Sequence, residues 1–160
     1  METNGRKIEF RYATGRDLVD EAKLLFVEYA RSLDTDLCFQ DFQTELETLP
    51  GKYAPPGGAL ILAYIGSCAA GCAALRKLSD EVCEMKRLFV RDAYKGLGIG
   101  RGLAEKIIEE AAKLHYRFIR LDTLPSMKKA QELYRSLGFY DIGPYVYNPV
   151  EGARYMELKL

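Results

Sequence analysis

The segment YKGLGIGRGL, residues 94–103, most constrains the fold because it places four glycines within seven positions. A chain keeps glycine at this density where its backbone turns tightly or approaches another group closely. Residues 84–90 (EMKRLFV) have the composition of a strand, and residues 98–114 carry apolar side chains at helical spacing. A glycine turn between a strand and a helix leaves unpaired amides at the helix start, where anions bind. We therefore predict a phosphate-binding turn here, flanked by Lys95 and Arg101.

The turn matches neither of the common nucleotide-binding glycine motifs. The dinucleotide motif G-x-G-x-x-G fails because its sixth position is Arg101 when counted from Gly96 and Leu103 when counted from Gly98. The P-loop motif G-x-x-x-x-G-K-[ST] is absent from the sequence. The turn is therefore expected to hold the pyrophosphate of a different cofactor.

Composition narrows the class of protein further. The 160 residues suffice for one domain with a hydrophobic core, and 48% of them are apolar. Lysine plus arginine equals aspartate plus glutamate at 23 each, so no basic excess indicates a nucleic-acid partner. No stretch approaches the roughly 20 apolar residues of a membrane span, and the start lacks the apolar segment of a secretory signal. We expect a soluble, cytoplasmic protein with no membrane partner.

The cysteines and the single histidine do not form a metal-binding pattern. No C-x-x-C pair occurs, and His115 stands alone near a predicted helix end, so we expect no metal site. Cys68, Cys72 and Cys83 lie in apolar, strand-like segments. They are expected to be reduced and buried.

Hydrophobic periodicity and turn residues predict one α+β domain over residues 1–160 with a mixed sheet. A helix is expected to follow Thr14, which is the predicted N-cap. Further helices are predicted at 39–48, 98–114 and 126–137. Strands are predicted at 7–12, 60–64, 68–76, 84–90, 118–122, 140–147 and 155–160.

Two segments carry a family resemblance. Residues 85–108 (MKRLFVRDAYKGLGIGRGLAEKII) resemble the acetyl-CoA signature of the GCN5-related N-acetyltransferases (GNAT), Q/R-x-x-G-x-G/A after a strand, here with Lys95, Gly98 and Gly100. Residues 130–143 (AQELYRSLGFYDIG) resemble the second conserved block of that family. The sequence departs from the family in having Lys95 at the first signature position and Met127 where asparagine is common.

The resemblance implies a central, mostly antiparallel, twisted sheet of about six or seven strands flanked by about four helices. It also implies direct transfer of an acetyl group from acetyl-CoA to a primary amine in a ternary complex. The strands that begin near Glu84 and after Arg117 would splay apart to admit the thioester. The backbone of Leu88, Phe89 and Val90 would bind the pantetheine. The pyrophosphate would be wrapped by Lys95, Gly96, Leu97, Gly98, Ile99, Gly100 and Arg101.

Acetyl transfer needs a neutral amine and a proton for the leaving thiolate. An amine with a pKa near 10.4 is only about one part in 2,500 neutral at pH 7, so acid–base help is valuable. By its match to the family tyrosine, Tyr134 is the predicted acid. Glu84, which opens a strand, is the predicted base acting through water, and Asp122 is the second candidate. A purely structural Tyr134, and acids that only pair with Lys86 or Arg87, remain open alternatives.

The acceptor is expected to be a small-molecule or peptide amine, and the chain a monomer or homodimer. Strand alternation predicts that Lys86 and Arg87 point to opposite faces. An aromatic wall at the acceptor end is predicted from Tyr140, Tyr145, Tyr147 and Tyr155. The alternative function is a non-catalytic acyl-CoA-binding sensor or regulatory module on the same fold.

Overall fold

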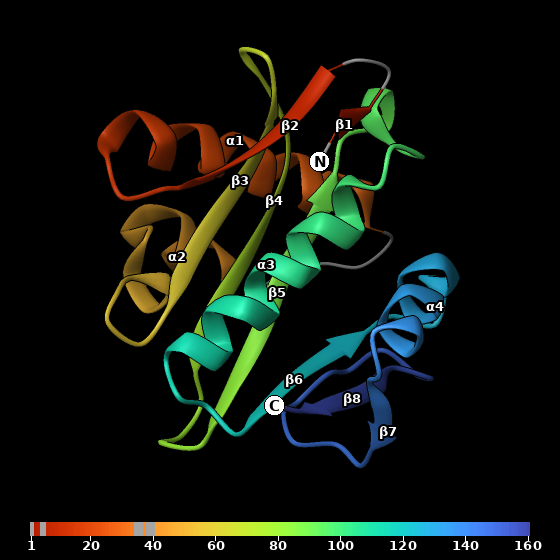
Figure 1. The fold of residues 1–160 in the computed structure, drawn as a ribbon. Helices are drawn as coiled ribbons and strands as arrows, with labels where there is room; N and C mark the ends of the chain where they lie inside the picture. Colours follow the sequence, from red (N-terminus) through yellow and green to blue (C-terminus); the bar gives the residue numbers. More distant parts are fainter. Residues whose placement is uncertain (1, 4–5, 34–36, 38–40) are drawn as a thin grey trace.

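Residues 2–3, 6–33, 37 and 41–160 are described in a computed structural model of the chain, in which helices cover a twisted sheet (Figure 1). The helices are α1 (Arg16–Ser32), α2 (Phe42–Thr48), α3 (Ile99–Lys113) and α4 (Lys128–Ser136), and short 3-10 turns form η2 (Gly51–Tyr53) and η3 (Asp92–Tyr94). The strands are β1 (Glu2–Thr3), β2 (Arg6–Tyr12), β3 (Ala59–Ile65), β4 (Cys68–Lys77), β5 (Val82–Val90), β6 (Phe118–Thr123), β7 (Tyr140–Ile142) and β8 (Arg154–Lys159).

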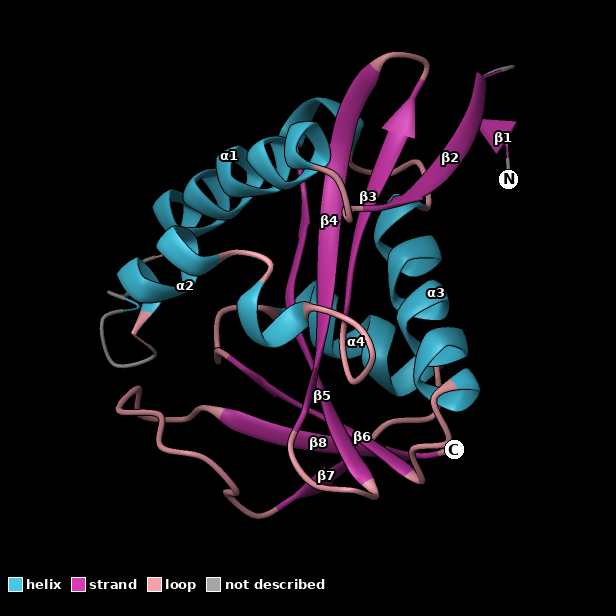
Figure 2. Cartoon of the chain, turned by 90° about the vertical axis from the view of Figure 1, so that its left-hand side faces the viewer, coloured by secondary structure: helices cyan, strands magenta, loops and turns pink. Residues whose placement is uncertain are grey.

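The described strands lie in the order β1-β2-β3-β4-β5-β6-β8-β7, with β1 adding only two residues to the edge. Among these strands, β5 and β6 form the only parallel pair. The predicted mixed, mostly antiparallel α+β architecture is therefore confirmed. In Figures 1 and 2, β6, β8 and β7 fan away from the longer strands β3 to β5.

The sheet separates two hydrophobic cores. Every residue of β3 is buried, and its alternate side chains divide between them. Ile61 and Ala63 face the core that contains α3, whereas Leu60 and Leu62 face the core that contains α1. Figure 2 shows α1 and α2 on one side of these strands and α3 on the other. Because both faces are covered, β3 has an unbroken apolar run instead of an alternating pattern.

Two predicted boundaries are wrong. Thr14 does not cap α1, because the helix begins later, with Gly15 as its extended N-cap and no side-chain cap hydrogen bond. The strand predicted over 140–147 ends at Ile142. Pro144 follows closely, and proline has no amide to donate to a strand ladder.

Two of the three cysteines in the strands are buried, and the second helix begins at Phe42. Cys72 and Cys83 are buried free thiols, as predicted, but Cys68 is exposed because it opens β4 at the end of a tight turn. The first residues of the helix predicted over 39–48 lie outside the described residues. The structure places α2 from Phe42 onward.

A β-bulge interrupts β5 where it pairs with β4. Cys72 pairs with Phe89 and Ala74 pairs with Lys86, so two residues of β5 oppose one residue of β4. One of these two residues, Arg87, has a φ of 61°, a left-handed conformation that is rare for a residue with a side chain. The bulge therefore changes the direction in which the following side chains point.

β5 and β6 pair over a short distance and then separate. Their parallel register runs only from Val82 opposite Phe118 to Glu84 opposite Arg120, which confirms the predicted splay. β6 continues by pairing with β8. Among the described strands, no partner covers the edge of β5 over residues 85–90 on the side away from β4, and a backbone-binding ligand can use this edge.

Substitution of Gly71 by alanine tests the close approach of β4 to the end of β5. A Cβ at Gly71 would clash with the carbonyl oxygen of Phe89 and would lie 3.2 Å from Leu103. Because the nearest atom belongs to the backbone, we expect Gly71→Ala to lower the free energy of unfolding by about 1–3 kcal/mol in urea denaturation.

Gly143→Ala is the matched control, since a Cβ there meets nothing within 4 Å. Its stability should stay within about 0.5 kcal/mol of the wild type. Equal stability of the two variants would contradict the strand register described here.

Candidate active site

A groove of about 760 Å³ runs between the end of β5, the glycine turn and the start of α4. Of the ten predicted cofactor-binding residues, eight line it: Leu88, Phe89, Val90, Lys95, Gly96, Gly98, Ile99 and Gly100. Leu97 packs against the hydrophobic core instead. Arg101 lies on the surface, where it donates to Ser136 at 2.9 Å and pairs with Glu105 at 3.0 Å.

The amino-terminal end of α3 opens into this groove. Gly98 is the N-cap with a φ of 82°, and no side chain caps the helix. The first turn carries no acidic residue, and the first intrahelical bond runs from the Gly102 amide to the Gly98 carbonyl at 3.0 Å. The preceding amides and the helix dipole therefore favour an anion at this end.

Packing within the protein does not demand glycine at every position of the turn. Gly96 and Gly98 have φ values of 81° and 82°, which side chains disfavour. At Gly100, however, an added Cβ would meet only Val90 at 3.6 Å, an ordinary contact. The missing side chain at Gly100 thus leaves room on the groove side, as a bound phosphate requires.

An electrostatic clamp fixes α1 beside the groove. Arg91, directly after β5, donates to the carboxylate of Glu28 at 2.8 and 2.6 Å and to the carbonyl of Ala69 at 2.8 Å. The next residue of α1, Tyr29, lines the groove, and burial raises its pKa to about 12. No sequence motif marked Tyr29, because its role depends on where α1 docks.

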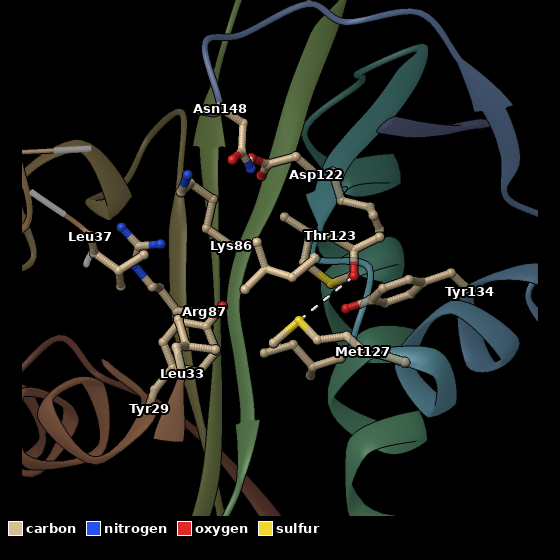
Figure 3. A pocket seen from close by; sticks show the side chains of 15 residues that line it. Tyr29, Leu33, Leu37, Lys86, Arg87, Asp122, Thr123, Met127, Tyr134 and Asn148 are labelled. Atoms are coloured by element: carbon tan, nitrogen blue, oxygen red, sulfur yellow. Dashed lines mark hydrogen bonds between the residues drawn. The ribbon is translucent and has the colours of Figure 1, made fainter. Parts of the chain in front are cut away.

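A second cavity, here called the inner pocket, lies in the gap between β5 and β6 (Figure 3). It is lined by Lys86, Arg87, Asp122, Met127, Tyr134 and Asn148, among others. Tyr29, Leu88, Met127 and Ala130 line both this pocket and the groove. The two cavities therefore meet, with the β5 bulge on one side and the start of α4 on the other.

Tyr134 points from α4 into the inner pocket (Figure 3). Its side chain is buried, with the ring 5.7 Å from that of Phe139. Burial is the main cause of a raised pKa for the Tyr134 hydroxyl. The phenol is therefore protonated at neutral pH and can donate a proton within the pocket.

Met127 occupies the position where the family often has asparagine. It is the N-cap residue of α4 but makes no capping hydrogen bond with its side chain. Its sulfur instead accepts a hydrogen bond from the Thr123 hydroxyl at 3.7 Å, drawn as a dashed line in Figure 3. The methionine thus puts a thioether, in place of an amide, at the junction of the groove and the inner pocket.

The two predicted base candidates occupy different environments. Glu84 is fully buried, with one oxygen bound by Arg76 at 2.7 Å and the other by the Tyr145 hydroxyl at 2.6 Å. Burial alone would raise its pKa, but the Lys86 ammonium and the Arg76 guanidinium hold that pKa below its ordinary value. Glu84 lines none of the described cavities, whereas Asp122 lines the inner pocket and accepts from Asn148 at 3.1 Å.

Lys86 and Arg87 both line the inner pocket, so the prediction that they face opposite sides is wrong. The reason is the bulge, which breaks the two-residue alternation of β5 at Arg87. The Arg87 guanidinium is held by Glu45 of α2 at 2.8 and 3.0 Å. Glu45 also accepts from the Tyr53 hydroxyl at 2.9 Å and pairs with Lys52 at 3.2 Å.

The predicted tyrosine wall does not form. Tyr145 donates to Glu84, Tyr140 donates to Glu157, and the ring of Tyr155 packs edge-on against Tyr145. Of the four tyrosines, only Tyr147, which is 75% exposed, lines a described cavity. Their alternation reflects packing and hydrogen bonding in and beside β7 and β8.

Comparison with known proteins agrees with this geometry. The acetyltransferase (GNAT) family profile matches residues 20–139. An uncharacterized N-acetyltransferase of Schizosaccharomyces pombe is 38% identical, over 89% of this chain and 88% of its own. Another uncharacterized N-acetyltransferase, from Dictyostelium discoideum, is 31% identical, and the match covers 89% of this chain and 94% of that protein. The N-acetylaspartate synthetase of Xenopus tropicalis is 33% identical, over 65% of this chain and 39% of that protein.

Solved structures show the same fold at lower sequence identity. An acetyltransferase from Streptococcus agalactiae superimposes with a TM-score of 0.79 at 21% identity, covering 96% of this chain and 98% of that one. A GNAT family acetyltransferase from Elizabethkingia anophelis, solved with acetyl-CoA bound, superimposes with a TM-score of 0.68 at 20% identity. The match covers 96% of this chain and 98% of that one.

The family profile and these relatives identify the chain as an acyltransferase of the N-acetyltransferase class. The chain belongs to the GNAT acetyltransferase family. Within the described residues, no helix combines the length and the apolar composition that a membrane crossing requires.

The Arg87–Glu45 pair can be tested through stability. Burial opposes ionisation of Glu45, but the hydrogen bonds and charge of Arg87 outweigh it and hold the pKa below its ordinary value of 4.5. Glu45→Gln leaves a buried guanidinium without its counter-charge, so we expect a loss of about 3–5 kcal/mol at pH 7. Because the folded pKa is depressed, this difference should shrink as the pH falls through 4.5 and below.

Urea denaturation at pH 7 and pH 4 measures both effects. Glu47→Gln, on the exposed face of the same helix, should change stability by less than about 0.5 kcal/mol at either pH. An equal effect of the two substitutions at pH 7 would show that the buried pair does not hold the bulge.

Proposed function

We propose that this N-acetyltransferase transfers the acetyl group of acetyl-CoA directly to the primary amine of a small molecule or peptide within a ternary complex. The observation that carries the proposal is the junction of the two cavities. The groove has the features of a site for a long phosphorylated chain, and the inner pocket carries a proton donor and a carboxylate. They share Leu88 and Met127, so the two substrates can meet there.

Acetyl-CoA is the acetyl donor of the family, and the groove offers separate contacts for its parts. The amides at the start of α3 and the glycine turn would hold the pyrophosphate. The uncovered edge of β5 at residues 88–90 would hydrogen-bond the pantetheine. The Lys95 side chain is 61% exposed, and within the described residues its one ion pair is with Asp92 at 2.7 Å, a surface pair that a phosphate can replace.

When bound, acetyl-CoA supplies an acetyl group activated as a thioester. In the proposed reaction the neutral amine forms the new bond to the carbonyl carbon while the bond from that carbon to sulfur breaks. Tyr134, whose phenol is protonated at neutral pH, donates its proton to the sulfur. The amine loses its proton to a base in the inner pocket.

We assign the role of base to Asp122, acting directly or through water. Glu84, the first candidate from the sequence, has both oxygens engaged by Arg76 and Tyr145 and does not reach the described cavities. In this proposal Glu84 supports the site instead, by holding β4 and the segment before β8 against β5. Acetylation of a small amine also agrees with the name of the N-acetylaspartate synthetases.

Acetyl-CoA binding is tested at Gly100. At about 100 times its dissociation constant, acetyl-CoA should stabilise the wild type by roughly 2.7 kcal/mol, about 5–10 °C in melting temperature. Gly100→Asp places a carboxylate at the phosphate position and should abolish this shift. The unliganded variant should remain folded, because an acid near a helix start is favourable.

Gly100→Ala is the control, since its Cβ meets only Val90 at 3.6 Å within the protein. It should retain part of the acetyl-CoA shift. A full shift in Gly100→Asp would mean that the turn does not bind the phosphates.

Tyr134→Phe tests the acid. The ring and its packing remain, so the melting temperature and the KM for acetyl-CoA should not change. Loss of the proton donor should lower kcat by about 10²-fold or more. CoA thiol release during turnover measures this effect.

Tyr12→Phe makes the same chemical change on β2, where the hydroxyl donates to Glu110 at 2.9 Å. This control should turn over at the wild-type rate. Wild-type kcat in Tyr134→Phe would assign Tyr134 to the core alone.

A further inference from the structure

Lys86 is a buried cation whose only ion pair among the described residues is a long one. Its side chain is 7% exposed, and its ammonium lies 3.9 Å from the nearest oxygen of Glu84. That oxygen already accepts from Arg76 at 2.7 Å, and the other accepts from Tyr145. Within the part of the chain that the structure describes, Glu84 is the only acid in ion-pair range of Lys86. A buried ammonium is costly unless a charged partner reaches it.

The Lys86 side chain lines two cavities. Lys86 lines the inner pocket, where Figure 3 shows its side chain reaching from β5 toward Asp122 and Asn148. It also lines a second cavity of about 350 Å³, here called the outer pocket, which contains Arg76, Lys52 and Tyr147. Only Lys86 and Asp122 belong to both, so they mark the passage from the outer pocket to the inner pocket.

The charged side chains around this passage are unevenly paired. The cationic side chains that line the two pockets are Lys52, Arg76, Lys86 and Arg87. The carboxylates within this cluster are Glu45, Glu84 and Asp122. Glu45 is shared by Arg87 and Lys52, and Glu84 is taken by Arg76. Asp41 is exposed at the rim of the outer pocket, and among the described residues Lys86 has only the long 3.9 Å ion pair with Glu84.

We propose that the Lys86 ammonium binds a carboxylate of the acceptor, which is therefore an amino acid or another small amine that carries a carboxylate. This inference rests on the proposed function and names the acceptor class for it. A carboxylate at the passage gives Lys86 a short, charge-assisted hydrogen bond. The amine of the same molecule then lies on the inner side, within reach of Asp122 and Tyr134.

The ionisation of Lys86 agrees with this role. Burial lowers its pKa to about 8, and the Glu84 and Asp122 carboxylates only partly oppose the effect. The ammonium is therefore mostly charged at pH 7. An acceptor carboxylate would supply the stabilisation that the protein's own carboxylates do not.

The test compares amino acids with their amides, and with the amines that lack the carboxyl group, as acceptors for the purified chain with acetyl-CoA. Amides are a stringent control, because loss of the negative charge lowers the pKa of the neighbouring ammonium and leaves more neutral amine. A site that recognises only the amine would therefore prefer the amide. We expect kcat/KM for the best amino acid to exceed that of its amide by about tenfold or more.

Three lysine variants assign the preference to Lys86. Lys86→Gln should lower kcat/KM for the amino acid by about tenfold or more, mainly through KM, and leave the amide nearly unchanged. Lys86→Arg keeps the charge and should retain much of the preference. Lys77→Gln removes an exposed lysine of β4 that pairs with Asp80 at 2.8 Å, and should behave as the wild type.

The failures of the two proposals can be told apart by a second measurement, the melting temperature of the acetyl-CoA complex with each acceptor. If no CoA is released but amino acids stabilise the complex in a Lys86-dependent way, the transfer proposal fails and the carboxylate site stands. The carboxylate site is overturned if amides are acetylated as well as amino acids. It is also overturned if Lys86→Gln reduces both equally, or if no amino acid reacts or stabilises the complex.

Discussion

The buried ion pair between Arg87 and Glu45 is the interaction on which the geometry of this site depends. Arg87 holds a left-handed backbone conformation inside β5, which costs on the order of 1–3 kcal/mol. Two hydrogen bonds to Glu45 stabilise this residue, and its carbonyl accepts from the Cys72 thiol at 3.3 Å. The bulge that results puts Lys86 and Arg87 on the same pocket and carries Leu88 to the junction with the groove.

β5 separates from β6 shortly before this bulge. Parallel pairing stops at Glu84, where the carboxylate is paired with Arg76 and hydrogen-bonded by Tyr145 instead of facing the gap. The gap is then lined by side chains from β5, β6 and α4, while the free edge of β5 faces the groove. One constraint, the loss of strand pairing after three residue pairs, thus produces both cavities.

The two cavities use different chemistry, and this difference affects what can be predicted for each. The groove relies on backbone amides, a helix terminus and glycines, so its residue types follow from local backbone geometry. The inner pocket relies on side chains from α1, α2, β5, β6 and α4 and from the segment near Asn148. Their charges compensate one another only when these elements are packed together.

The sequence by itself determined the local features: the order of the helices and strands, the glycine turn before α3, the α+β class and the family. These depend on residues close together in the chain, and periodicity and glycine spacing report them directly. Only the tertiary structure decided that Lys86 and Arg87 share a pocket, that Glu84 is engaged by Arg76 and Tyr145, and that Asp122 faces the gap. Those outcomes depend on a bulge stabilised by Glu45, 42 residues away along the chain, and no local pattern encodes such a contact.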